Sequence, residues 1–301
     1  MPSNDEFTVS WICTSDLELS FAVAALDETY HTPSNTVQYA HTNGYILGRI
    51  GTLNVVVLDL QRFADVVGPN IQRNFPFIKF GLIAGPGSGI PQEDYDMRLG
   101  DVVVSCPSTE TGVGAIIQFK EECTTQGLRF TSGRCVNHPH MAVLSAMVAV
   151  ETTARLKGLK IPHYTPLQRE PYDVLYEPTN DENPEHDREY NLCEHIKGAM
   201  RQETGRVLGP KIHTGPVACL GSLLDDAAKR DEMKERFGII GVKQGAKGMA
   251  GMVAVGFPMT VICGIADYAD SPSLTNEHFR GYAAAAAAGY AKELLNCIRD
   301  V

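Results

Sequence analysis

Two aspartates near the C-terminus of the chain are the strongest candidates for chemistry. Asp267 and Asp270 follow residues 261–265, an apolar run short enough to predict a buried strand. An Ala-rich segment, 279–298, comes next and predicts a helix. In open α/β sheets, ligands bind beyond the carboxyl ends of the strands. Asp267 therefore has the position of a catalytic carboxylate, although aspartate is also a common turn residue and the two acids could simply end the strand.

A third acid, Glu18, lies in a pattern that is typical of a helix start. Residues 15–18 read Ser-Asp-Leu-Glu, which matches a capping box and gives Glu18 a purely structural interpretation. A glycine-rich run at 85–89, Gly-Pro-Gly-Ser-Gly, follows another apolar segment. Glycines there allow close approach of backbone to a ligand, but the run matches neither the Walker motif nor the dinucleotide fingerprint. By itself it fits a tight turn equally well.

The composition excludes several classes of protein. A net charge of −10 argues against nucleic-acid binding, which needs a basic face. No apolar run approaches the roughly 20 residues of a membrane span. The N-terminus is acidic and lacks a signal-peptide pattern, and the eight cysteines form no C-x-x-C pair. We therefore expect a reduced, cytoplasmic protein that binds neither nucleic acid nor membrane. No cofactor is expected. The pair His138 and His140 has no third ligand nearby, so no metal site is expected either.

Strand and helix patterns alternate along the chain, which predicts an α/β fold with a mixed or mostly parallel sheet. Strands are expected at 7–13, 45–50, 53–60, 79–84, 101–105, 114–119, 211–219, 238–242 and 261–265. Helices are expected at 19–29, 66–74, 141–157, 223–237 and 279–298. Residues 170–195 differ, because they are rich in acids and prolines, and they predict an exposed insertion.

Several of these segments together resemble the purine nucleoside phosphorylase and methylthioadenosine nucleosidase family, and especially its fungal members. The matching runs are 11–13, 16–19, 45–51, 80–91, 97–105, 212–215, 264–270 and 282–295. They follow the family order over nearly the whole chain. The resemblance implies one domain over 1–301, with a mixed central sheet partly closed into a barrel and flanked by helices. It also implies a homo-oligomer.

The resemblance assigns roles to both carboxylates. An aspartate at the position of Asp267 protonates the purine leaving group in that family, and a glutamate near the position of Glu18 activates water in the nucleosidase branch. Gly85, Gly87 and Ser88 would lie beside the substrate, and Cys219 stands in the segment that binds the base.

The departures from the family pattern matter as much as the matches. The family motif Glu-Met-Glu, whose second glutamate binds the ribose hydroxyls, falls on Lys247, Gly248 and Met249 when counted back without gaps. Losing that contact should cost a few kcal/mol. Pro86 also removes a backbone N–H from the glycine run. Lysines after strand ends most often point to solvent, which is the simplest interpretation of Lys243 and Lys247. Because they match the position of the ribose-binding motif, Lys247, Gly248 and Met249 are nevertheless candidate substrate-binding residues, and a lysine that enters the pocket could polarise a carbonyl or hold a carboxylate.

Three functions remain open on this basis. The first is an enzyme that performs isomerisation, cyclisation, elimination or hydrolysis on a non-nucleoside molecule, in fungal secondary metabolism. The second is a nucleoside phosphorylase or nucleosidase that cleaves a purine N-glycosidic bond. The third is a catalytically inactive ligand-binding or scaffold protein. Retention of both carboxylates favours an enzyme, and the missing ribose glutamate favours the first function over the second.

Overall fold

A computed structural model describes most of the chain outside the central acidic region. The described residues are 2–30, 45–61, 71–90, 97–109, 111–124, 127–136, 139–157, 210–222, 224, 226–245, 257–269 and 277–299. The predicted insertion at 170–195, most of the predicted helix at 66–74, the run Lys247, Gly248 and Met249, and Asp270 lie outside these ranges.

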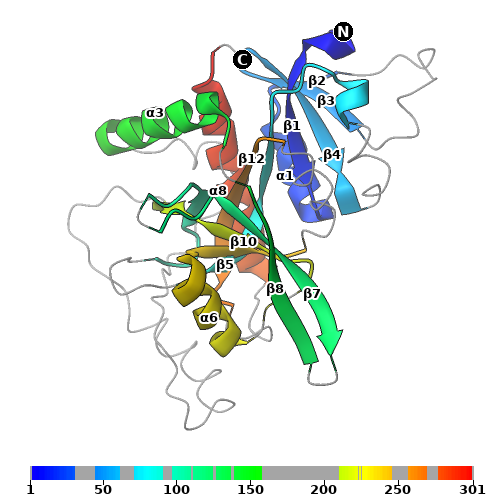
Figure 1. Ribbon diagram of the computed structural model, residues 1–301. Helices are drawn as coiled ribbons and strands as arrows, with labels where there is room; N and C mark the ends of the chain where they lie inside the picture. The colour runs from blue at the N-terminus through cyan, green and yellow to red at the C-terminus, as the bar shows by residue number, and fades with distance from the viewer. Residues whose placement is uncertain are drawn as a thin grey trace.

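Twelve strands among the described residues form one mixed sheet, shown in Figure 1. The main path runs β2-β3-β4-β1-β5-β11-β10-β7-β8, while β12 pairs with β5 and β6, and β6 pairs with β9. The strands are β1 (Phe7–Cys13), β2 (Glu28–Tyr30), β3 (Tyr45–Ile50), β4 (Leu53–Asp59), β5 (Phe80–Gly89), β6 (Val102–Ser105), β7 (Ile116–Thr124), β8 (Gly127–Val136), β9 (Ile212–Gly215), β10 (Val217–Cys219), β11 (Gly241–Lys243) and β12 (Met259–Asp267).

The sheet branches at β5 instead of closing into a barrel. β5 runs parallel to β1 at its start and to β12 along most of its length, and its last residues pair antiparallel with β11. Among the described strands, β2 pairs only with β3 and β8 only with β7, so the two ends of the path do not meet. The predicted partial barrel is therefore wrong. A strand of a closed barrel pairs with two neighbours, whereas the ten-residue β5 pairs with three strands, β1, β11 and β12.

The described helices are α1 (Asp16–Ala25), α3 (Met141–Lys157), α6 (Ala227–Phe237) and α8 (Glu277–Asn296), with a short 3₁₀ turn, η1 (Asn4–Glu6). In Figure 1, the red α8 lies along β12 and β5, with α1 and the green α3 beside it. Small side chains make this close packing possible. A Cβ atom on Gly264 of β12 would collide with the backbone carbonyl of Ala283 in α8, so this glycine is required by contact and not by its backbone angles.

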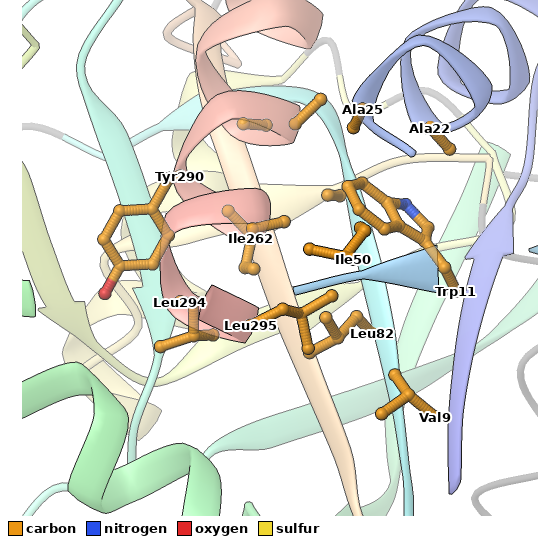
Figure 2. Packing of buried hydrophobic residues seen from close by; sticks show 14 of the residues in the cluster. Val9, Trp11, Ala22, Ala25, Ile50, Leu82, Ile262, Tyr290, Leu294 and Leu295 are labelled. Atoms are coloured by element: carbon orange, nitrogen blue, oxygen red, sulfur yellow. The ribbon is translucent and has the colours of Figure 1, made fainter. Parts of the chain in front are cut away.

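The core beneath α8 and α1 consists of large apolar side chains from β1, β3, β5 and β12. Figure 2 shows Trp11, Leu82 and Ile262 facing Tyr290 and Leu295 of α8. All five side chains are almost completely excluded from water. At about 25 cal/mol per Å² of apolar surface, such burial is the main stabilising contribution to the fold. It holds the carboxyl ends of β1, β5 and β12 at fixed positions.

Most predicted strands and helices exist, with three instructive differences. The run at 85–89 is not a loop, because it forms the second half of β5. The expected strand at 211–219 is interrupted at Pro216, and its halves, β9 and β10, pair with different partners. No strand was expected at 127–136, where β8 forms a long hairpin with β7.

Candidate functional site

A cavity of about 330 Å³ opens where β1, β5, β11 and β12 end. It lies at the carboxyl edge of the parallel strands, as the sequence predicts for a ligand site. It is lined by Thr14, Ser15, Glu18, Pro86, Gly87, Ser88, Gly221, Ser222, Lys243, Gln244, Gly245, Ala266, Asp267 and Arg280. Four of the predicted site residues, Glu18, Gly87, Ser88 and Asp267, thus share one cavity although they come from distant segments.

Glu18 is held in place by the strand–helix junction that follows β1. Ser15 caps α1, and its hydroxyl accepts the N–H of Glu18 at 3.3 Å, which is half of the predicted capping box. The Glu18 carboxylate turns instead to Thr14, and its Oε2 accepts both the backbone N–H at 2.7 Å and the hydroxyl at 3.0 Å. Glu18 also packs against Gly85, where any side chain would collide with it. Gly85 therefore makes room for Glu18 and is not itself on the cavity lining.

The second oxygen of Glu18 forms a buried ion pair with Lys243. The Lys243 ammonium lies 2.5 Å from Oε1, and the side chains of both residues are only 2% exposed. The ammonium also donates to the carbonyl oxygen of Pro86 at 3.2 Å. Burial tends to lower the pKa of Lys243, but the Glu18 carboxylate outweighs it and the net pKa is raised. Lys243 is therefore a fixed cation of the site.

The expectation that Lys243 points to solvent is wrong. Lys243 ends the three-residue β11, whose neighbours β10 and β5 are buried, so its side chain has no route to water along the sheet. The partner that offsets its charge comes from the other end of the chain. In the sequence, Lys243 is recognisable only as a lysine directly after an apolar run, and this pattern does not indicate whether the side chain faces the interior or the solvent.

Asp267 is the last residue of β12 and lies beside Ser88 of β5 in the sheet register. It is partly exposed and lines the cavity. Its Oδ1 accepts the N–H of Ala269 at 3.1 Å, and Ala269 has a φ of 55°, in the left-handed region. Asp267 thus stabilises a strained turn while its carboxylate remains on the cavity wall. Asp267 is therefore both a turn residue and a residue of the cavity lining.

The middle of the glycine run, Pro86, Gly87 and Ser88, lines the cavity as part of the strand β5. A Cβ atom on Gly87 would lie 2.9 Å from the sulfur of Cys263 and 2.8 Å from the carbonyl oxygen of Val242, so glycine is needed where β5, β11 and β12 approach one another. Ser88 is buried, and its hydroxyl accepts a hydrogen bond from Gln244 Nε2 at 2.7 Å. Ser88 and Gln244 therefore give this side of the cavity polar groups that are held in fixed orientations.

Cys219 does not reach the cavity, contrary to its predicted place among the substrate contacts. It is buried in β10, next to Lys243 in the sheet register. Burial raises the pKa of the Cys219 thiol far above its usual range, and burial likewise raises the pKa of Cys263 to about 12. Both thiols are therefore protonated core residues and not nucleophiles.

Among the residues that the structure describes, no group of three or more His, Cys, Asp or Glu side chains is placed to hold a metal ion. A search of the same residues finds no helix long and apolar enough to cross a membrane. A buried contact of 3.0 Å between His213 and Asp101 lies outside the cavity lining. Asp101 also accepts the N–H groups of Arg98 and Lys211, so this cluster joins the starts of β6 and β9.

The fold is that of the 5′-methylthioadenosine/S-adenosylhomocysteine nucleosidases. The nucleosidase of Colwellia psychrerythraea, solved with adenine, matches with a TM-score of 0.59 and 13% identity over 99% of this chain and 98% of that chain. The nucleosidase of Neisseria meningitidis, solved with methylthio-immucillin-A, gives 0.53 and 14% over 96% and 98%. The futalosine hydrolase of Helicobacter pylori gives 0.54 and 12% over 98% and 99%. At these identities the likeness shows the fold alone.

A relative found by sequence comparison is named as a different kind of protein, not as a nucleosidase. A nucleotide-binding leucine-rich repeat (NLR)-like protein of the fungus Hyaloscypha variabilis is 34% identical over 310 residues. The alignment covers 98% of this chain but only 29% of the relative, so the chain corresponds to one part of a much longer protein. No family model matches the chain.

Proposed function

We propose that this chain binds a small polar molecule in the cavity and that Asp267 transfers a proton to or from it. The observation that carries the proposal is the arrangement of charge: Asp267 shares the cavity with Glu18, and Lys243 neutralises Glu18 at 2.5 Å. A carboxylate held at the edge of an apolar strand is suited to general acid–base catalysis.

The same arrangement argues against a nucleoside as the substrate. Cleavage of an N-glycosidic bond develops positive charge on the sugar, and that charge is stabilised by negative groups around it. Here the ammonium of Lys243 offsets the charge of Glu18, and it remains protonated because its pKa is raised. We therefore favour acid–base chemistry, such as an isomerisation, cyclisation, elimination or hydrolysis, on a non-nucleoside compound.

A second candidate is a ligand-binding module of a longer receptor-like protein. The NLR-like relative favours it, because nearly the whole of this chain aligns with 29% of that protein. In this case the cavity would bind its ligand without turnover, and Asp267 would act only as a hydrogen-bonding group and a turn residue.

Exchange of substrate protons with solvent separates these functions. The purified chain is incubated in D₂O with a panel of small metabolites, together with adenosine, inosine and methylthioadenosine with and without phosphate, and the products are analysed by mass spectrometry. We expect deuterium incorporation or conversion of a non-nucleoside compound, reduced about 10²- to 10⁴-fold in Asp267→Asn. The exposed Asp231, which pairs with Arg230 outside the cavity lining, provides the control Asp231→Asn.

Each alternative has its own result. Release of free purine at about 1 s⁻¹ or faster would replace the proposal with nucleosidase activity. Conversion at full rate by Asp267→Asn would refute the proton-transfer role. Binding of a compound without exchange or conversion would favour the receptor module.

A further inference from the structure

Arg280 is a second cation of the cavity, and no sequence pattern predicts a role for it. It lies near the start of α8, is partly buried, and lines the cavity with Asp267. Among the described residues, no ion pair or hydrogen bond engages its guanidinium. Lys243 differs, because Glu18 already neutralises it. Arg280 is thus the lining cation whose charge is not offset by a described side chain.

Several other donors at the cavity are already engaged by acceptors of the protein. The N-terminus of α1 would attract an anion, but Ser15 already accepts the N–H of Glu18 and the Glu18 carboxylate already accepts the N–H of Thr14. Ser88 and Gln244 bond to each other at 2.7 Å. Only Arg280 presents a charged donor to the cavity without a described acceptor.

A partly desolvated guanidinium that has no partner among the described residues favours binding of an anion. Its planar, five-donor fork matches the two oxygens of a carboxylate or phosphate, and such bidentate pairs are among the stronger hydrogen-bonded contacts in proteins. The cavity volume of about 330 Å³ lies at the small end of the range for ligand pockets. One small molecule with a single anionic group therefore suits the space.

We propose that the molecule bound in this cavity carries a carboxylate or phosphate group and that Arg280 binds this group. The inference rests on the proposed function, since it names the substrate class for the same cavity. An oxyanion anchored at Arg280 orients the remainder of the molecule in the cavity that Asp267 also lines. Arg280 would therefore determine specificity and position the substrate for proton transfer.

The test measures binding of three probes by isothermal titration calorimetry at constant ionic strength. Inorganic phosphate and malonate represent the two oxyanion sources, and adenosine is an uncharged probe. The variants are Arg280→Gln and Arg280→Lys, with Arg236→Gln as the matched control. Arg236 is exposed, pairs with Glu232 on α6, and does not line the cavity. Circular dichroism verifies that each variant is folded.

We expect phosphate, malonate or both to bind, with an affinity that falls about 10- to 100-fold in Arg280→Gln and is unchanged in Arg236→Gln. The affinity of Arg280→Lys should lie between those of the wild type and Arg280→Gln, because lysine keeps the charge but lacks the planar fork of N–H donors. The probe that binds more tightly identifies whether the bound molecule carries a phosphate or a carboxylate group. The inference is overturned if neither oxyanion binds, or if both bind equally well to wild type and Arg280→Gln. Loss of activity in Asp267→Asn would leave the proposed function standing in those cases, so the two failures are distinguishable.

Discussion

Replacement of Lys243 by methionine tests the central contact of the site. Lys243→Met keeps the length of the side chain but leaves the buried Glu18 carboxylate with only its hydrogen bonds to Thr14. Removing one partner of a buried ion pair typically costs about 3–5 kcal/mol, because the other charge stays unpaired out of water. We expect a loss of that size in the free energy of unfolding.

A double-mutant cycle isolates the pair. Glu18→Gln, Lys243→Met and the double variant are compared, and the double variant should be more stable than the sum of the single losses predicts, because it leaves no unpaired charge. The control is Lys229→Met, which removes an exposed pair with Asp226 on α6. That pair should contribute less than about 1 kcal/mol.

Urea unfolding followed by tryptophan fluorescence provides the measurement. Trp11 is the single tryptophan and is completely buried, so unfolding changes its environment. The pH dependence has a definite sign. The folded-state pKa of Lys243 lies above the ordinary 10.5, so the contribution of the pair is complete below about pH 10.5 and is lost as the pH rises through the folded-state pKa. The gap between wild type and Lys243→Met should therefore stay constant at neutral pH and narrow in strong alkali.

One result would refute this reasoning. If Lys243→Met and Lys229→Met lower stability by the same small amount, and the cycle shows no coupling, then Lys243 does not pair with Glu18. In that case the charge of Glu18 would not be offset, and the site would be compatible with the positive charge that develops on the sugar of a nucleoside.

A close helix–strand contact, two buried thiols and the proposed homo-oligomer each give a further expected outcome. Gly264→Ala should destabilise the fold by about 2 kcal/mol or more, since its Cβ would collide with the Ala283 carbonyl, and thermal unfolding will show no change if the contact is absent. Iodoacetamide at pH 8 should label the exposed Cys297 in the folded protein and spare Cys219 and Cys263, whose pKa values burial raises; peptide mass spectrometry that finds rapid labelling of either buried thiol contradicts this. Light scattering at micromolar concentration should give a multiple of 32.8 kDa, as expected for the proposed homo-oligomer, and the monomer mass would refute it.

The sequence by itself determined most of the strands and helices and the place of Asp267 at the end of one strand. The apolar run of β12 predicted both the strand and the place of Asp267 at its end, because a buried strand is a local pattern of side chains. The helix at 141–157 was also predictable, since its bounds are those of α3. Element order indicated only an α/β fold with a mixed sheet, whereas the nucleosidase-like fold was implied by the resemblance of several short runs to a known family, and the solved structures confirm that fold.

Only the tertiary structure decided how the charges of the site combine. Lys243 and Glu18 are 225 residues apart in the chain, and no local pattern relates them. Gly85 and Gly87 of β5 have no Cβ atom, and this lets Glu18 of α1 and the backbone of β11 approach the same strand. These contacts join segments that are distant in sequence. The partial barrel was predicted wrongly for the same reason, because closure depends on pairing between strands and not on the strands themselves. A sequence specifies which residues can carry a charge, but burial and neighbours decide which charges are neutralised and which face a ligand.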